Sequence, residues 1–152
     1  MSTALYLVSS GSINLVNSGS LSFFVPPYGI IFDGASQESC GGSPSCDSFG
    51  SVYVPGTYSF FSSSIINNYG TVLGTLPAPN RYASFASKFN INGLYSHSFI
   101  VDAGNDDISF GTICDSTSNV YLCGYYNGTS PLIRFVNNLN VTSNVGTLPA
   151  SA

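Results

Sequence analysis

The sequence predicts an all-β protein, and three observations lead to that prediction. Sixteen glycines and eight prolines are spread along the 152 residues. No window repeats apolar residues at the three- and four-residue spacing of an amphipathic helix. Short runs of valine, isoleucine, phenylalanine and tyrosine recur instead, with turn-forming residues between them. We therefore predict one domain over residues 1–152, a jelly-roll-like antiparallel β-sandwich with extra strand material at the N-terminus.

Thirteen segments have the composition of strands, because each is short and rich in β-branched or aromatic residues. In chain order they span residues 4–8, 13–16, 21–25, 29–32, 51–54, 57–66, 71–73, 82–91, 98–102, 107–113, 119–124, 132–136 and 139–145. The turn sequences between them include Asn-Ser-Gly, Pro-Pro-Tyr-Gly, Pro-Gly, Asn-Tyr-Gly, Asn-Gly and Asn-Gly-Thr. Such residues supply the backbone angles that a chain reversal needs.

The N-terminal segment Thr3 to Val25 alternates apolar and polar residues and carries no charge. Charged residues normally keep an edge strand from pairing with other chains, so an uncharged strand favours such pairing. We expect residues 1–25 to add to a sheet edge of a neighbouring copy. The expected oligomerisation residues are Leu5, Leu7, Ile13 and Leu15. At the other end, residues 142–152 are predicted to form a tail.

Charged residues are scarce: three are basic and seven are acidic. The net charge is −4. Arg81, Lys88 and Arg134 cannot form the basic stripe that binds nucleic acid or anionic lipid. The longest apolar runs fall far short of the roughly eighteen residues of a membrane-spanning helix, and Met1–Ser10 lacks the basic start of a signal peptide. A surface of Ser, Thr, Asn and Tyr packs against copies of itself without desolvating ions. The expected partner is therefore the chain itself.

Residues 51–65 read Ser-Val-Tyr-Val-Pro-Gly-Thr-Tyr-Ser-Phe-Phe-Ser-Ser-Ser-Ile. The pattern predicts a strand, a Pro-Gly turn and a second strand, with Tyr58 and Phe60 in the core. It resembles the strand, Pro-Gly turn and Tyr-x-Phe signature of the C1q and tumour-necrosis-factor-like domains. Three further stretches, residues 29–33, 100–110 and 130–135, resemble other strands of that family and follow in the same order. The resemblance implies a jelly roll that forms a symmetric oligomer, although the cysteines and the strands before Pro26 depart from the family pattern.

The four cysteines, Cys40, Cys46, Cys114 and Cys123, form two pairs that are close in sequence. Four cysteines allow three connectivities. Because sequence neighbours are the easiest to bring together, we predict disulfides between Cys40 and Cys46 and between Cys114 and Cys123. Pairing across the sandwich and free buried thiols are the alternatives. Disulfides imply an oxidising location, outside the cell or on a virion surface, or the interior of a hyperthermophile.

Oxygen-bearing side chains surround Gly104. They are Asp102, Asn105, Asp106 and Asp107. Hard oxygens of this kind suit Ca²⁺, although their spacing does not match an EF-hand. A solvated polar hairpin tip is the alternative interpretation, and no other cofactor is expected.

Little in the sequence indicates catalysis, because the chain has one histidine, His97, one glutamate and no nucleophile-elbow or metalloenzyme motif. We therefore expect no catalytic residues and no enzyme. Two sequons begin at Asn127 and Asn140. They are N-glycosylation sites or chance occurrences in a chain rich in Asn and Thr, and both interpretations stay open.

Ten tyrosines and eleven phenylalanines exceed the needs of one small core, and tryptophan is absent. Aromatic residues are enriched in subunit interfaces, whereas sugar-stacking faces rely on tryptophan. We interpret the chain as a non-enzymatic, self-assembling structural protein of a virion (capsid, spike or fibre) or of an extracellular filament. Its composition is similar to that of external structural proteins of heat-loving archaea and their viruses. The alternative is a trimeric C1q-like surface head that binds a glycan or a receptor.

Overall fold

The computed structural model describes residues 5–9, 28–36, 38–39, 42–67, 69–129 and 131–150. Within these residues the chain forms thirteen strands and no helix. In chain order the strands are β1 (Leu5–Ser9), β2 (Tyr28–Gly34), β3 (Glu38–Ser39), β4 (Ser45–Cys46), β5 (Val52–Ser59), β6 (Ser63–Asn67), β7 (Val72–Leu76), β8 (Tyr82–Phe89), β9 (Tyr95–Asp102), β10 (Ile108–Cys114), β11 (Val120–Tyr125), β12 (Leu132–Asn137) and β13 (Thr142–Thr147). The predicted all-β class is confirmed.

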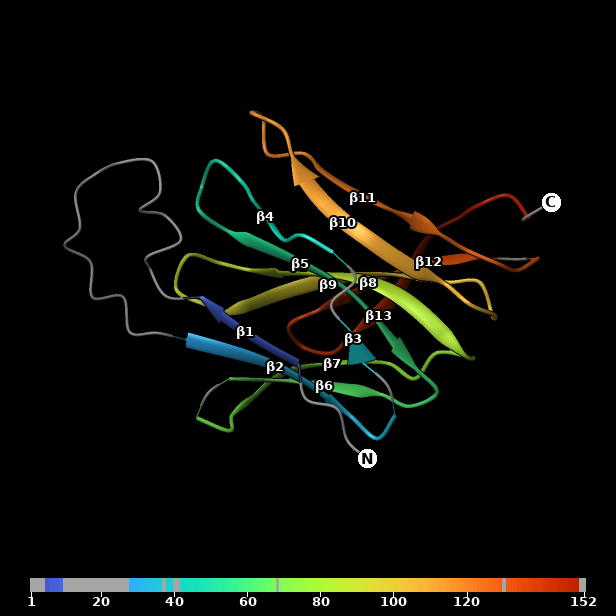
Figure 1. The fold of residues 1–152 in the computed structure, drawn as a ribbon, viewed down its shortest axis with the longest axis horizontal. Coiled ribbons are helices and arrows are strands. Elements are labelled where there is room, and N and C mark those ends of the chain that lie inside the picture. Colours follow the sequence, from blue (N-terminus) through green and yellow to red (C-terminus); the bar gives the residue numbers. More distant parts are fainter. Residues whose placement is uncertain are drawn as a thin grey trace.

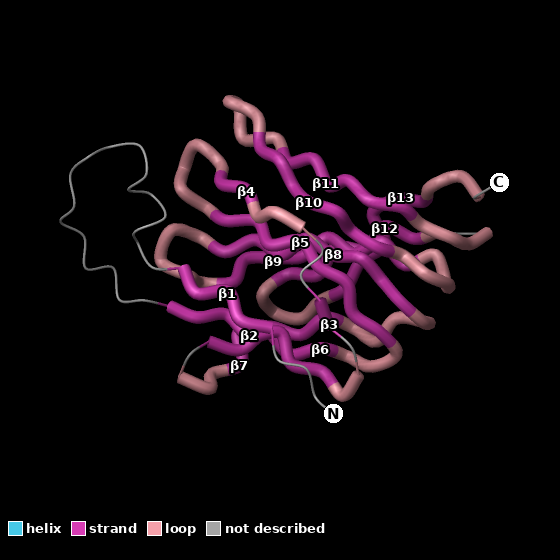
Figure 2. Tube along the Cα trace, viewed as in Figure 1, coloured by secondary structure: helices cyan, strands magenta, loops and turns pink. Residues whose placement is uncertain are grey.

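The strands form three sheets. One has four strands in the order β1-β2-β6-β7, and a larger one has the order β13-β12-β9-β8-β5-β3, with β4 also paired to β5. Strands β10 and β11 form a separate hairpin. In Figure 1 the four-stranded sheet lies below β5, β8 and β9, and the β10–β11 hairpin lies above them. The tube view shows the same strands linked by loops alone in the described residues (Figure 2).

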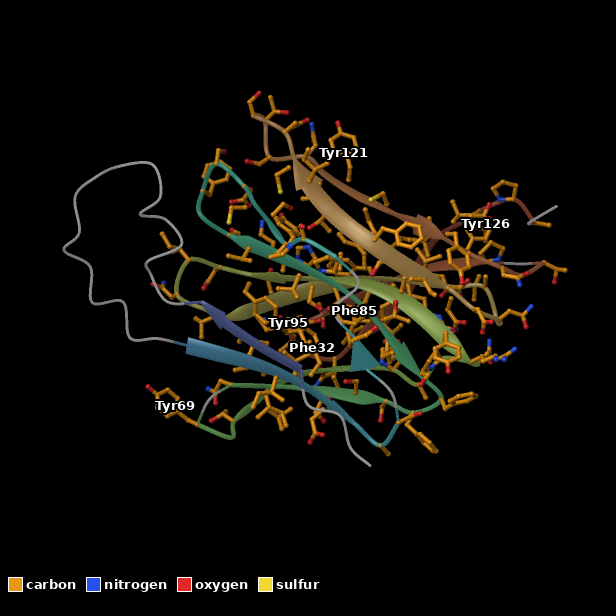
Figure 3. All side chains as sticks on the ribbon, in the orientation of Figure 1. Phe32, Tyr69, Phe85, Tyr95, Tyr121 and Tyr126 are labelled. Atoms are coloured by element: carbon orange, nitrogen blue, oxygen red, sulfur yellow. The ribbon has the colours of Figure 1, made fainter. Side chains whose placement is uncertain are left out.

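The hydrophobic core lies between the four-stranded and the seven-stranded sheet. The first sheet contributes Ile30, Phe32, Ile65 and Leu76, and the second contributes Val54, Tyr58, Ala83, Phe85, Phe89, Tyr95, Ile100 and Val136. The ring of Phe32 lies 4.8 Å from that of Phe85, centroid to centroid, and so joins the two sheets near the centre of the core (Figure 3). Alternation along the strands therefore produces a two-layer β-sandwich.

Two glycines let aromatic rings pack directly on the backbone. A Cβ atom at Gly56 would lie 2.4 Å from the ring of Phe85, and one at Gly74 would lie 2.5 Å from the ring of Tyr95. Both distances are well inside van der Waals contact. A side chain at either position would push a core ring out of place.

The predicted Pro-Gly turn is wrong, because β5 runs unbroken through Pro55 and Gly56. On the side of β5 away from β8, strand β4 pairs with residues 52–53 and β3 pairs with residues 57–58. Pro55 lies between these two partners, where its missing N–H costs no bond to either strand.

Phe60 is another correction. Tyr58 is 0% exposed, as predicted, but Phe60 is 47% exposed and its φ is 60°. The chain leaves the seven-stranded sheet here and enters the four-stranded one as β6. The predicted strand 57–66 is therefore two strands in different sheets, and Phe60 lies at the corner between them.

Leu5–Ser9 pairs with β2 as an edge strand of the chain's own four-stranded sheet. These residues complete the sandwich and are not surplus to it. Ile13, Leu15 and the strands predicted at 13–16 and 21–25 lie outside the described residues. At the C-terminal end, the predicted tail contains β13, which pairs with β12.

We expect Phe85→Ala to lower the free energy of unfolding by about 3–5 kcal/mol, because it removes a ring that contacts both sheets. Phe60→Ala should cost about 1 kcal/mol or less, since half of that ring is already in water. Urea unfolding of both variants checks this. Equal losses would show that the corner at Phe60 has been misplaced.

Candidate interaction surfaces

In the described part of the chain the same five-residue turn closes five hairpins, and we call it the Asx turn. The five turns span residues Asp47–Ser51, Asn67–Thr71, Asn90–Leu94, Asp115–Asn119 and Asn137–Val141. In each, the side-chain oxygen of the first residue accepts the N–H groups of the third and fifth residues at 2.8–3.0 Å. The fourth residue has a φ between 61° and 79°.

Local chemistry explains the turn. A short Asp or Asn side chain reaches its own backbone two residues further on, and Gly, Asn or Ser at the fourth position accepts the left-handed conformation. The backbone N–H and C=O of the first residue also pair with those of the fifth and fourth residues, which closes the hairpin. The recurring spacing, Asp or Asn three residues before Gly, Ser or Asn, is visible in the sequence but was missed as a repeat.

Strand register brings the five turns to one end of the sandwich. The start of β5 pairs with the end of β8, and the end of β12 pairs with the first half of β9. The turns at 47–51 and 115–119 touch through Ser48 and Ser118, whose hydroxyl oxygens lie 2.6 Å apart. Near the start of β7, Gly74 packs on Tyr95 at the start of β9. In Figure 1 several of these turns lie toward the left of the view, and Figure 3 places Tyr69 there.

Large apolar side chains occupy the third position of three Asx turns. Phe49 and Tyr69 are 77% exposed and Leu139 is 76% exposed. The other two turns have Asn92 and Thr117 at this position, so the turn itself does not require an apolar residue. We call this surface the turn-lined end. Among the described residues, its exposed apolar side chains are Phe49, Tyr69, Val72, Ile91, Leu94, Leu139 and Val141.

Every basic side chain of the chain is paired with an aspartate of the same chain. Near the turn-lined end, Lys88 lies 3.1 Å from the Oδ2 of Asp47 and above the ring of Tyr53. Burial alone would raise the pKa of Asp47, but hydrogen bonds from Ser51 and Lys88 outweigh it and hold that pKa below its usual value. The cations are thus already used within the fold.

The β10–β11 hairpin presents a second apolar surface. Phe110, Ile113, Tyr121 and Tyr125 are exposed on it, and neither strand contains a charged residue. A register shift at Phe110 re-aims that side chain, whose ring centroid lies 5.9 Å from that of Tyr125. On its other side, Ser109 donates to the carbonyl of Gly56 and Thr112 to that of Tyr53. These bonds attach the hairpin to β5 at Tyr53 and Gly56.

A cavity of about 390 Å³ opens at the opposite end from the Asx turns. It is lined by Ser39, Thr57, Arg81, Tyr82, Asp106, Ile108 and Tyr125. Arg81 and Asp106 form an exposed ion pair at 3.3 Å on its wall. Two tyrosine rings and a polar pair could hold a small neutral ligand.

The predicted calcium residues do not converge. Asp102 pairs with Arg134 at 3.0 Å inside the fold, and Asp106 pairs with Arg81. Asp107 accepts the N–H groups of Ala103 and Asn127, and burial raises its pKa although both bonds lower it. Asn105 is exposed, and its carbonyl accepts the N–H of Tyr82. In the described residues no group of three or more His, Cys, Asp or Glu side chains could hold a metal ion.

Neither predicted disulfide is present. Cys46, Cys114 and Cys123 are free, and Cys40 lies outside the described residues. In the β10–β11 register Cys114 lies opposite Val120, whereas Cys123 lies opposite Gly111. Three residues of strand separate the two positions by about 10 Å, beyond the reach of about 7 Å between Cα atoms. The predicted Cys114–Cys123 pair was wrong because closeness in sequence does not set strand register, whereas the Cys40–Cys46 pair involves a residue outside the described ones.

His97 lies on the outer face of β9 with its ring 5.3 Å from that of Phe99 and 5.1 Å from that of Phe135. Burial lowers the pKa of His97, and the charge of Lys88 lowers it further.

The sequon residues are both exposed. Asn140 is the fourth residue of an Asx turn, and its side-chain oxygen accepts the N–H of Thr75.

No family model, curated protein or solved structure matches this chain. The described residues contain no candidate for a membrane-spanning helix. The function is therefore inferred from the chain's own surfaces.

Asn137→Ala should lower the free energy of unfolding by about 1–2 kcal/mol, because two backbone N–H groups lose their acceptor. Its exposed neighbour offers a control, and Asn138→Ala should change the stability by less than about 0.5 kcal/mol. Thermal unfolding measures both. Equal stability of the two variants would contradict the role given to the Asx turn.

The lowered pKa of His97 predicts a pH dependence of stability. In the unfolded chain His97 takes up a proton near pH 6.5, before it does so in the fold. Its contribution is thus present above about pH 6.5 and is lost as the pH falls through the folded pKa. Wild-type protein should lose more stability than His97→Gln between about pH 7 and pH 5. Parallel curves for the two proteins would contradict this assignment.

Proposed function

We propose that this chain is a self-assembling structural subunit of a virion or an extracellular filament, and that its copies meet through the turn-lined end. The observation that supports this is the exposure of large apolar side chains at the third position of the Asx turns. Three of the five turns place Phe49, Tyr69 and Leu139 there, each about three-quarters exposed. A turn that also forms with Asn92 or Thr117 gains nothing from these side chains within the fold. Their use lies outside the single chain.

The energetics favour a contact made by several tips together. Burying one such side chain contributes about 1.5–3 kcal/mol. Three of them give about 5–9 kcal/mol, which is comparable with the cost of about 4–15 kcal/mol for bringing two molecules together. The four further apolar residues of the turn-lined end add to this sum. Burial of most of this surface therefore releases enough free energy to hold two copies together.

Charge indicates the chemistry of the partner. With all three cations paired internally, an acidic partner finds no free basic group. The net charge of −4 over 152 residues also gives little repulsion between copies. A neutral, apolar and hydroxyl-rich surface is the complementary partner, and another copy of this chain has that composition.

A surface binding head is the second candidate. The cavity between Tyr82 and Tyr125, with its exposed Arg81–Asp106 pair, suits a neutral hydroxylated ligand such as a glycan. A head of this kind would stop at a closed trimer, whereas a filament or shell subunit forms open or much larger assemblies. The size distribution of purified protein separates the two candidates.

The test of the proposal is a triple variant, Phe49→Ser, Tyr69→Ser and Leu139→Ser. We expect it to keep the wild-type melting temperature within a few degrees and to remain monomeric where wild-type protein assembles. The matched control is the double variant Asn92→Ser and Thr117→Ser, which changes the same turn position in the other two turns and should assemble normally. Light scattering and electron microscopy give the readout. Normal assembly of the triple variant would overturn the proposal.

A further inference from the structure

Cys46 and Cys114 lie on neighbouring segments, although 67 residues separate them in the chain. The stretch from Ser43 to Cys46 runs beside β10 in the same direction. Ser43 and Gly111 form a parallel bridge, and Thr112 donates its N–H to the carbonyl of Ser43 at 3.2 Å. These contacts bring the end of β4 to the end of β10.

Side-chain contacts also join β4 to β10. The hydroxyl of Ser45 lies 3.2 Å from the sulfur of Cys114 and donates to the hydroxyl of Thr112 at 3.0 Å. Cys46 is the next residue after Ser45. Although Cys46 is exposed as a residue, partial burial of its thiol raises its pKa, and the charges of Cys114 and Asp47 raise that pKa further. Three residues on from the parallel Ser43–Gly111 bridge, Cys46 lies level with Cys114.

Accessibility differs between the two cysteines. Cys46 is exposed, whereas Cys114 is half-buried. A small oxidant in solution reaches Cys46 first, and the thiol of Cys114 then lies nearby to complete the exchange. Exposure, and not a lowered pKa, therefore makes Cys46 the attacking cysteine and Cys114 the resolving one.

We infer that Cys46 and Cys114 form a disulfide when the chain meets a small disulfide oxidant such as oxidised glutathione. The thiolate of Cys46 attacks one oxidant sulfur and releases the first small thiol. The thiolate of Cys114 then attacks the sulfur of Cys46, forms the protein S–S bond and releases the second small thiol. Two protein S–H bonds become one S–S bond, the two protons pass to the released thiols, and the two electrons reduce the oxidant.

The bond would fasten β4 to β10, and through β10 the whole β10–β11 hairpin. That hairpin is attached to β5 by the side-chain bonds of Ser109 and Thr112. A crosslink over so long a stretch of chain restricts the unfolded state strongly. The expected rise in melting temperature is about 5–15 °C. This inference does not depend on the proposed assembly function.

Trypsin provides a sharp test, because Arg81, Lys88 and Arg134 are the only cleavage sites. Cys40 and Cys46 fall in the peptide 1–81, and Cys114 and Cys123 fall in the peptide 89–134. After incubation with oxidised glutathione and digestion without reductant, the inferred bond joins these two peptides. A bond from Cys40 to Cys46 or from Cys114 to Cys123 leaves them separate.

Variants identify the sulfurs. Cys46→Ser and Cys114→Ser should each abolish the joined peptide and the rise in melting temperature. Cys40→Ser and Cys123→Ser are the matched controls and should keep both. Separate peptides after oxidation, or a joined peptide that survives in Cys46→Ser or Cys114→Ser, would overturn the inference.

Discussion

One hydrogen-bonding arrangement, in which a single Asp or Asn oxygen accepts two backbone N–H groups, recurs in five hairpins. Each turn sets which residues face each other in the two strands that it joins. A slip of one residue would move the core side chains of a strand to the wrong face. The position of Phe85 against Phe32 therefore depends on turns that lie at the end of the sandwich. The same geometry points the third residue of each turn into solvent.

Scarcity of charge shapes both the interior and the surface. Arg134 and Asp102 meet inside the fold, and Lys88 covers the ring of Tyr53 while it neutralises Asp47. Each pair reduces the cost of burying a charge. What remains on the surface is mostly hydroxyl, amide and exposed apolar groups, which lose little when they leave water against a similar surface. Folding and the proposed assembly thus follow from the same composition.

The sequence predicted the all-β class and the burial of Tyr58, because composition and strand alternation are local properties. It could not predict that Pro55 continues a strand, since that depends on where β3 and β4 end beside it. The predictions for Cys114 and Asp102 were wrong for a related reason. Cys114 meets Ser45 on β4, and Asp102 meets Arg134 on β12, so both partners come from distant parts of the chain. The repeated Asx turn was predictable, because the spacing of Asp or Asn three residues before Gly, Ser or Asn is a local property of the sequence.

Sedimentation velocity of wild-type protein at low and high salt tests the central claim most directly, since it asks which force joins the copies. At about 1 M salt charge interactions are screened beyond about 3 Å, whereas apolar burial is not weakened. We predict that the assembled fraction at about 1 M sodium chloride equals or exceeds that at about 0.05 M. Dissociation into monomers at high salt, or a chain that stays monomeric in both, would contradict an uncharged, turn-lined contact.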